Sequence, residues 1–233
     1  THLYPINGSW DALKTILQGG QAGSISMSSS GERSINWQQV NDQFATLAIT
    51  KLTYDPNNTQ TFYFCTGEGW YNADATPGQG VWKSTDGGST WNQLASTSSN
   101  VNFQYCQDID VHPITSDVDV ATRAGGLMRS QDGGNTFQKV LGVGYGAQRN
   151  SICDVEFTAS GGIFATIGIF ESLGGIYYSA TGDSGTWTKQ VNGYPINGIY
   201  RTESATAPSN DNVAYAVNMN SSTQGIRGFY KTT

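Results

Sequence analysis

Two acids and two aromatic residues lie within one glycine-rich stretch of the chain, residues 66–79. They are Glu68, Trp70, Tyr71 and Asp74. The face of an aromatic ring stacks on the C–H groups of a sugar, while carboxylates hold its hydroxyls. The stretch therefore predicts a loop that binds carbohydrate through Trp70, Tyr71 and Asp74. The alternative is that both rings only pack the loop onto its neighbour.

Arginine and tyrosine side chains occupy comparable stretches further along the chain. We predict that Arg123, Tyr200 and Arg201 belong to the same ligand-binding face. An aromatic ring beside an arginine suits a sugar, because the ring stacks on it while the guanidinium holds its hydroxyls. These three residues extend the predicted contact surface for a carbohydrate or protein ligand beyond the first loop.

Hydrolysis of a glycosidic bond needs two carboxyl groups on either side of it, about 5–5.5 Å or 6.5–9.5 Å apart. The acids available in the predicted loops are Glu68, Asp74, Glu171 and Glu203. Glu68 and Glu171 are our candidates for a catalytic role. A solvated loop acid is the alternative reading of each of the four.

The composition restricts the classes of partner. Charged residues make up 13% of the 233 residues, against roughly 25% in an average soluble domain, and such a weakly charged surface suits an exported protein. The net charge of −6 disfavours nucleic acid as a partner, because phosphate binding needs clustered Lys and Arg. No apolar run reaches the length of about 18 residues that a membrane-spanning helix needs.

The cysteines and the start of the chain bear on the compartment. The chain opens at Thr1 without a methionine. We interpret it as a processed or partial product whose export signal has been removed, and we expect an extracellular or cell-surface protein. Cys65, Cys106 and Cys153 form an odd, sparse set, so we expect three small buried side chains. With two histidines in the chain, we predict neither a metal site nor a cofactor.

One pattern of residues occurs at 80–91 and again at 126–137. It reads glycine, two apolar residues, Lys or Arg, Ser, any residue, Asp, Gly, Gly, any residue, Thr and an aromatic. A looser copy runs from Gly175 to Trp187 with one extra residue, and a fourth copy begins at Gly228. The leading glycines are 46, 49 and 53 residues apart. This spacing predicts a repeat architecture.

Each copy follows two segments of alternating apolar and polar residues, such as 49–55 and 61–65. Alternation bounded by Pro, Asn, Asp and Gly is typical of β-hairpins. With one strand entering the repeated turn and one leaving it, each unit has four short strands, which is the blade of a β-propeller. We therefore predict an all-β fold, a β-propeller of four-stranded antiparallel blades in a partial ring, with a closed five-bladed ring as the alternative. The blades are expected at about 45–94, 105–141, 152–191 and 198–233, the last one truncated, after an N-terminal segment, 1–44, that holds a decayed blade and a short helix or turn near 10–17.

The repeated turn is expected to be a structural device. Its aspartate carboxylate accepts backbone N–H groups of the same turn, and its two glycines supply the positive φ angles that a tight hairpin needs. The aromatic residue at its end packs between neighbouring blades. The predicted structural set is Ser84, Asp86, Gly88, Trp91, Ser130, Asp132, Gly134 and Phe137.

The S-x-D-G-G-x-T-W pattern resembles the Asp box, or BNR repeat, of sialidases, sortilin-type propellers and family 74 glycoside hydrolases. Together with residues 52–69 it is similar to large exported BNR-repeat proteins of Bacteroidetes. The resemblance covers about residues 45–233. It implies a secreted or cell-surface β-propeller and leaves the activity open, because unrelated chemistries share these blades.

The resemblance implies several functions. Our first hypothesis is a binding or scaffold module for glycans or proteins, partnered by the remaining blades of a longer chain or by a larger surface assembly. The alternative is a glycoside hydrolase, xyloglucanase-like or sialidase-like, and a chaperone propeller is the third hypothesis. Residues 122–126 lack the acid that family 74 enzymes carry in the matching stretch, and the F/Y-R-I-P signature of sialidases is absent. Both departures weigh against hydrolysis.

Overall fold

The computed structural model describes residues 25–27, 33–35, 37, 39–40, 44, 48–69, 74–142, 151–168, 173–223 and 225–232. The helix or turn expected near residues 10–17 lies outside the described residues, as do Trp70, Tyr71 and Glu171.

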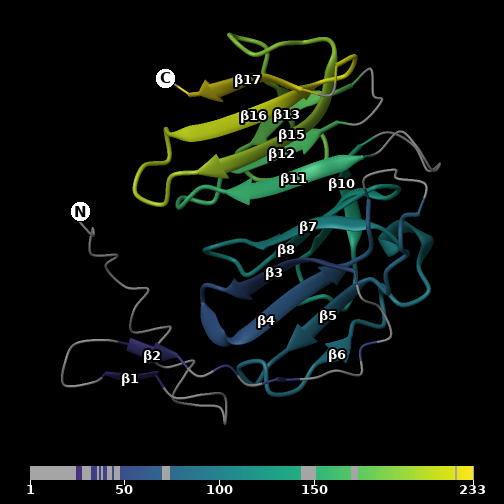
Figure 1. Cartoon of the computed structure of the whole chain (residues 1–233), viewed down its shortest axis with the longest axis vertical. Helices are drawn as coiled ribbons and strands as arrows, with labels where there is room; N and C mark the ends of the chain where they lie inside the picture. The colour runs from purple at the N-terminus through teal and green to yellow at the C-terminus, as the bar shows by residue number, and fades with distance from the viewer. Residues whose placement is uncertain are drawn as a thin grey trace.

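The described residues form five antiparallel sheets (Figure 1). A two-stranded hairpin comprises β1 (Ile25–Met27) and β2 (Arg33–Ile35). We call the four larger sheets blades I to IV in chain order. Blade I has β3 (Ile49–Asp55), β4 (Asn58–Thr66), β5 (Val81–Ser84) and β6 (Asn92–Gln93). Blade II has β7 (Cys106–Val111), β8 (Val118–Thr122), β9 (Gly126–Ser130) and β10 (Gln138–Leu141). Blade III has β11 (Ile152–Phe157), β12 (Ile163–Ile167), β13 (Gly175–Ser179) and β14 (Thr188–Lys189), and blade IV has β15 (Ile199–Thr206), β16 (Ala214–Asn220) and β17 (Ile226–Lys231).

Within each blade, consecutive strands are hydrogen-bonded neighbours. Short polar turns make this meander possible. After β3, for example, the Asp55 carboxylate accepts the backbone N–H of Asn57 at 2.9 Å, which is the local bond that favours Asp in turns. The middle strands β8 and β9 are buried along their whole length. A strand buried on both faces requires packing on either side of its sheet, and the neighbouring blades supply that packing.

The first strands of the four blades lie side by side around one axis. β3 contacts β7, β7 contacts β11, and β11 contacts β15. Figure 1 shows β7 and β11 between β3 and β15. The blades therefore fan outward from these inner strands and form part of a ring.

Apolar side chains fill the space between successive blades. Between blades I and II, Tyr63 and Val81 pack with Ile109 and Val120. Between blades II and III, a second cluster joins side chains of β8 and β9 to those of β11 and β12. A third, smaller cluster joins blades III and IV. Each cluster buries apolar surface that one blade alone leaves exposed, so the blades stabilise one another.

These features define an all-β protein with the β-propeller architecture, in which, among the described residues, three four-stranded antiparallel blades and one three-stranded blade form a partial ring. The three cysteines are buried and free, as predicted. Among the described residues, the structure has no helix with the length and apolar character of a membrane span.

Candidate functional site

The turn between β5 and β6 is closed by hydrogen bonds to one carboxylate. Asp86 Oδ1 accepts the hydroxyl of Ser84 at 2.7 Å and the backbone N–H of Thr90 at 2.9 Å. Its Oδ2 accepts the hydroxyl of Thr90 at 2.6 Å. Gly87 and Gly88 have φ angles of +72° and +88°, which glycine adopts without strain. The bonds from Thr90 and Ser84 lower the pKa of Asp86 to about 2, so the carboxylate stays ionised near neutral pH.

The turn between β9 and β10 repeats this geometry. Asp132 accepts the hydroxyl of Ser130 at 2.8 Å, and the N–H and hydroxyl of Thr136 at 2.9 and 2.6 Å. The N–H of Gly134 donates to Ser130 Oγ at 2.8 Å, and the ring of Phe137 lies 5.0 Å from that of Phe103. Both carboxylate oxygens of each aspartate accept hydrogen bonds within their own turn, which is a structural arrangement.

The turn between β13 and β14 is closed by hydroxyl groups, without an aspartate carboxylate. The hydroxyls of Ser179 and Thr186 bond directly to each other at 2.6 Å, and Ser179 Oγ accepts the N–H of Gly182 at 2.7 Å. Thr181 occupies the place after Ser179 that aspartate occupies in the first two copies. The bond between Ser179 and Thr186 thus takes the place of the carboxylate bonds that Asp183, displaced from the position of the aspartate, does not make here.

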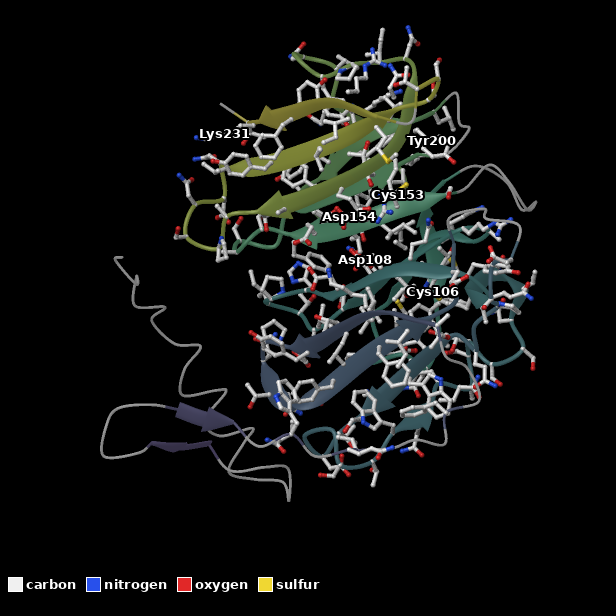
Figure 2. The ribbon with its side chains drawn as sticks, viewed as in Figure 1. Cys106, Asp108, Cys153, Asp154, Tyr200 and Lys231 are labelled. Atoms are coloured by element: carbon white, nitrogen blue, oxygen red, sulfur yellow. The ribbon has the colours of Figure 1, made fainter. Side chains whose placement is uncertain are left out.

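A different set of acids lies on the inner strands. The pairing register of each inner strand shifts near its start, just before Lys51, Asp108 and Asp154. A β-bulge changes the direction in which the side chains beside it point. In Figure 2, Asp154 on β11 and Asp108 on β7 lie next to each other between the two strands.

Each of these carboxylates also holds the inner strand of the next blade. Asp108 Oδ2 accepts the backbone N–H of Val155 at 3.1 Å, and Asp154 Oδ2 accepts that of Ser204 at 2.6 Å. The inner edge of an innermost strand has no further strand to pair with. The acids therefore satisfy buried N–H groups that need a partner, and they join blade II to III and III to IV.

Two cations balance part of this acidic charge. Lys51 Nζ lies 3.1 Å from Asp108 Oδ1 and 3.9 Å from Glu156 Oε1. Burial opposes the charge on Lys51, but the carboxylates of Asp108, Glu156 and Asp154 together outweigh burial and raise the pKa of the ammonium. On β15, Arg201 Nε donates to Glu203 Oε1 at 2.6 Å. The region stays acidic because these carboxyl groups outnumber the two cations.

Burial keeps protons on several of these carboxyl groups. It raises the pKa of Glu156 to about 7 and that of Asp110 to about 6. Burial and the neighbouring charge of Asp108 raise the pKa of Asp154 well above its usual range. Burial also raises the pKa of Glu203. Neutral and ionised carboxyl groups therefore coexist on the axis near neutral pH.

A small cleft opens among these residues, and we call it the axial cleft. Its volume is about 160 Å³. Each of the four inner strands contributes two side chains to it. They are Thr50, Lys51, Gln107, Asp108, Cys153, Asp154, Arg201 and Glu203.

Three carboxylates at this place have the grouping that can hold a cation. Ligand oxygens of Asp108, Asp154 and Glu156 all lie within 4.8 Å of one another. Lys51 already supplies a positive charge to Asp108 and Glu156. Lys51 therefore balances part of the negative charge of this group.

The predicted ligand-binding residues lie at the end of the blades where the inner strands begin. Arg201 is part of the axial cleft, and Tyr200 precedes it, at the right of the view in Figure 2. The guanidinium of Arg123 lies over the ring of Tyr105, 4.7 Å from its centroid. Asp74 is exposed. Arg201 thus joins the axial acids, whereas Arg123 belongs to the rim formed with Tyr105.

The candidate catalytic residue Glu68 takes part in its own loop. Its Oε2 accepts the backbone N–H of Thr76 at 3.0 Å. The loop is also tied to the start of blade II, because the N–H of Gly78 donates to the carbonyl of Gln104 at 2.7 Å and Gln107 Nε2 donates to that of Gly69 at 3.4 Å. These bonds give Glu68 a loop-closing role.

Sequence reasoning overlooked Lys51, Asp108, Asp154 and Glu156 as site residues. A signal was present, since acids alternate with apolar residues in 106–111 and 152–157, at the start of two predicted blades. Acids at successive alternate positions of buried strands need partners, and this requirement points to a shared site.

Comparison with known proteins supports the fold. No protein-family model matches the chain, and no curated protein matches it in sequence. The solved structures that it resembles include the GH74 xyloglucanase from Xanthomonas campestris, with a TM-score of 0.58, 21% identity, and coverage of 84% of this chain and 31% of that one. The Niastella koreensis GH74 enzyme has a TM-score of 0.55 and 20% identity, with coverage of 79% and 30%.

An ancestral GH74 enzyme is similar to the same degree, with a TM-score of 0.55, 17% identity, and coverage of 79% of this chain and 27% of that one. The chain therefore spans about a third of the length of these enzymes or less. At such identities the likeness establishes the β-propeller fold.

Proposed function

We propose that the chain forms part of an exported Asp-box β-propeller that binds carbohydrate at the axial cleft. The observation that carries this proposal is the convergence of polar side chains from all four inner strands in one open cleft. Sugar hydroxyls both donate and accept hydrogen bonds. The cleft offers donors in Lys51, Gln107 and Arg201 and acceptors in Asp108 and Glu203.

The size and the rim of the cleft bear on the ligand. A cleft of about 160 Å³ is smaller than the roughly 300–1,000 Å³ of a typical ligand pocket. It suits one terminal sugar unit or a charged substituent, with the rest of the glycan outside. Tyr200 and the Arg123–Tyr105 pair supply aromatic surface at the same end of the blades. The low content of charged residues, 13%, supports an extracellular or cell-surface location.

Calorimetric titration with soluble oligosaccharides, including xyloglucan fragments, tests the proposal. We expect Arg201→Gln and Glu203→Gln each to weaken binding by about tenfold or more, as loss of a charged hydrogen bond does. Ile114→Ser is the matched control, because this exposed side chain lies on the loop between β7 and β8, at the other end of the blades. Equal affinity of all three variants for the sugar, or binding of none of the sugars, would refute the proposal.

Glycoside hydrolysis is the second candidate function. The coexistence of neutral and ionised carboxyl groups favours it, because the pKa of about 7 at Glu156 suits a general acid. The likeness to GH74 enzymes supports the same chemistry. Against it, carboxylate oxygens within 4.8 Å of one another are closer than the 5–5.5 Å that a retaining pair uses.

Release of reducing sugar from xyloglucan or other β-glucans separates catalysis from binding. If the chain hydrolyses these polymers, Glu156→Gln and Glu203→Gln should lower the rate, and the loop variants Glu68→Gln and Glu171→Gln test the acids predicted from sequence. Turnover that survives all four substitutions excludes these acids from catalysis.

A further inference from the structure

Two cysteines from neighbouring blades lie in one apolar cluster. Cys65 on β4 and Cys106 on β7 both belong to the cluster between blades I and II, and neither side chain is exposed to solvent. Figure 2 shows Cys106 beside the strands of blade I. A single buried thiol packs as a small apolar group, whereas two thiols that meet across an interface can also join covalently.

The backbone places the two cysteines against each other. Thr50 Oγ1 on β3 lies 3.2 Å from Cys65 Sγ and donates to the carbonyl oxygen of Cys106 at 3.1 Å. A Cβ added to Gly67 would lie 2.9 Å from the Cα of Tyr105. The end of β4 and the start of β7 are therefore in direct contact, as a disulfide requires, because its two Cα atoms must lie within about 7 Å of each other.

The two thiol groups also meet. The Cys106 thiol forms a hydrogen bond with the Cys65 thiol, and burial together with this bond raises the pKa of the Cys106 thiol. Only the thiolate form attacks a disulfide, and an oxidant cannot reach sulfur atoms that are enclosed between two blades. Oxidation of the pair accordingly belongs to folding, when the two blades first pack and the sulfur atoms are still open to solvent.

We propose that Cys65 and Cys106 form a disulfide bond that links β4 of blade I to β7 of blade II. The oxidant is a small-molecule disulfide such as glutathione disulfide. The thiolate of one cysteine displaces one glutathione thiol and forms a mixed disulfide, and the thiolate of the other cysteine then displaces the second glutathione and closes the bond. The two thiols of the chain give up two protons and two electrons, which end on two molecules of glutathione.

The bond closes a loop of about 40 residues, which contains the first repeated turn. Closing such a loop restricts the unfolded chain and stabilises the folded one. The third cysteine, Cys153, lies on β11 of blade III and stays free in this pairing. It is 1% exposed, so it is an internal control with the same burial. Pairing in a defined redox buffer depends neither on the location of the protein nor on the carbohydrate site.

Oxidative refolding tests the pairing. The 233-residue chain is unfolded with denaturant and reductant and then refolded in a buffer of reduced and oxidised glutathione, and alkylation of the unfolded product counts the free thiols. We expect one free thiol in place of three, with the alkyl group on Cys153. In a tryptic digest, the peptides 52–83 and 84–123, which carry the other two cysteines, should be joined.

Thermal unfolding measures the effect of the bond. The chain refolded with glutathione disulfide should have a Tm that is on the order of 10 °C higher than that of the chain refolded with reductant. Cys65→Ala and Cys106→Ala should abolish this difference, whereas Cys153→Ala, the matched control at an equally buried cysteine, should keep it. If either of the first two variants fails to fold, the digest of the unsubstituted chain still shows whether the two peptides are joined.

Three results would overturn the proposal: three free thiols after refolding with glutathione disulfide, a crosslink that contains the peptide of Cys153, or glutathione left attached to Cys65 or Cys106. A Tm no higher with the bond than without it would overturn the proposal as well, because it would mean that the packed blades do not accommodate the bond. Loss of sugar binding at the axial cleft leaves each of these outcomes unchanged.

Discussion

Arg129 on β9 donates from Nη1 to the carbonyl oxygen of Thr181, which lies 2.6 Å away in the turn of the next blade. Lys83 does the same one blade earlier, where its Nζ donates to the carbonyl of Gly133 at 2.8 Å. Both residues occupy the Lys/Arg position directly before the serine of the repeated pattern. In blades I and II this position therefore links the blade to the turn of its successor, in addition to the apolar clusters between them.

The first prediction concerns the Lys83 link. Lys83→Met keeps the length of the side chain and removes the donor to Gly133, so we expect a loss of about 1 kcal/mol in the free energy of unfolding. Lys231→Met is the matched control, because Lys231 is exposed and lies at the same register of blade IV, and surface substitutions change stability by about 0.5 kcal/mol or less. Urea denaturation of both variants measures the two changes in the free energy of unfolding. Equal destabilisation by the two would argue against a specific link.

The second prediction is that position 182 must be glycine, because the Arg129 side chain occupies the space of a Cβ there. A Cβ at Gly182 would overlap the guanidinium of Arg129, whereas a Cβ at Gly185 meets nothing within 4 Å. Both glycines have positive φ, +73° and +86°, so alanine is strained by roughly 1–2 kcal/mol at either position. Gly182→Ala should cost about 1–3 kcal/mol more than Gly185→Ala because of overpacking. Thermal or urea unfolding of the pair separates the contact from the backbone strain, and equal costs would contradict the role given to Arg129.

The buried ion pair of blade II provides the third prediction. Arg129 Nε and Nη2 donate to the two oxygens of Asp119 at 2.8 and 2.7 Å, and both side chains are almost completely buried. Asp119→Asn leaves a buried guanidinium without its counterion and should cost about 3–5 kcal/mol. The double variant Asp119→Asn with Arg129→Met should recover part of this loss, since it removes the orphaned charge. A double-mutant cycle measures the coupling, and a double variant less stable than the sum of the single losses would contradict the interpretation.

Much of the fold was predictable because its determinants are local. The glycines of the repeated turn and the alternation before it lie within about twenty residues of each other, and they predict four strands per unit. The structure shows that arrangement in blades I to III. Propeller packing accounts for the middle strands that are buried on both faces, such as β8 and β9.

The candidate site was harder to predict because it is assembled between blades. Asp108 accepts a hydrogen bond from Val155, 47 residues away, and Lys51 pairs with acids of two other blades. A pattern of neighbouring residues cannot show which side chains meet across such long sequence separations. Arg201 was found in advance as a loop residue of suitable chemistry, but its place in the axial cleft depends on the bulge at the start of β15.

The last prediction concerns pH. The pKa values of Asp110 and Glu156 are raised to about 6 and 7 from 3.8 and 4.5, and burial also raises the pKa of Asp154 well above its usual range. Between about pH 4.5 and 7 the folded chain therefore binds more protons than the unfolded chain, and its stability falls as the pH rises through this range. Below pH 4 the sign reverses, because Asp86 and Asp132 have pKa values lowered to about 2 and the unfolded chain takes up protons first.

The stability of the chain should accordingly be greatest near pH 4–5 and lower at pH 8. Glu156→Gln keeps the shape of the side chain and removes one titrating group, so it should reduce the difference in stability between the two pH values by on the order of 2 kcal/mol, as expected from a pKa raised from 4.5 to about 7. Ile114→Ser, at an exposed side chain of the loop between β7 and β8, removes no titrating group and should leave the difference unchanged. Urea denaturation at pH 5 and pH 8 at constant ionic strength measures it. Higher stability at pH 8 than at pH 5 would mean that Lys51 and Arg201, rather than protons, neutralise the axial acids, because ionised carboxylates held by fixed cations gain stability as the pH rises.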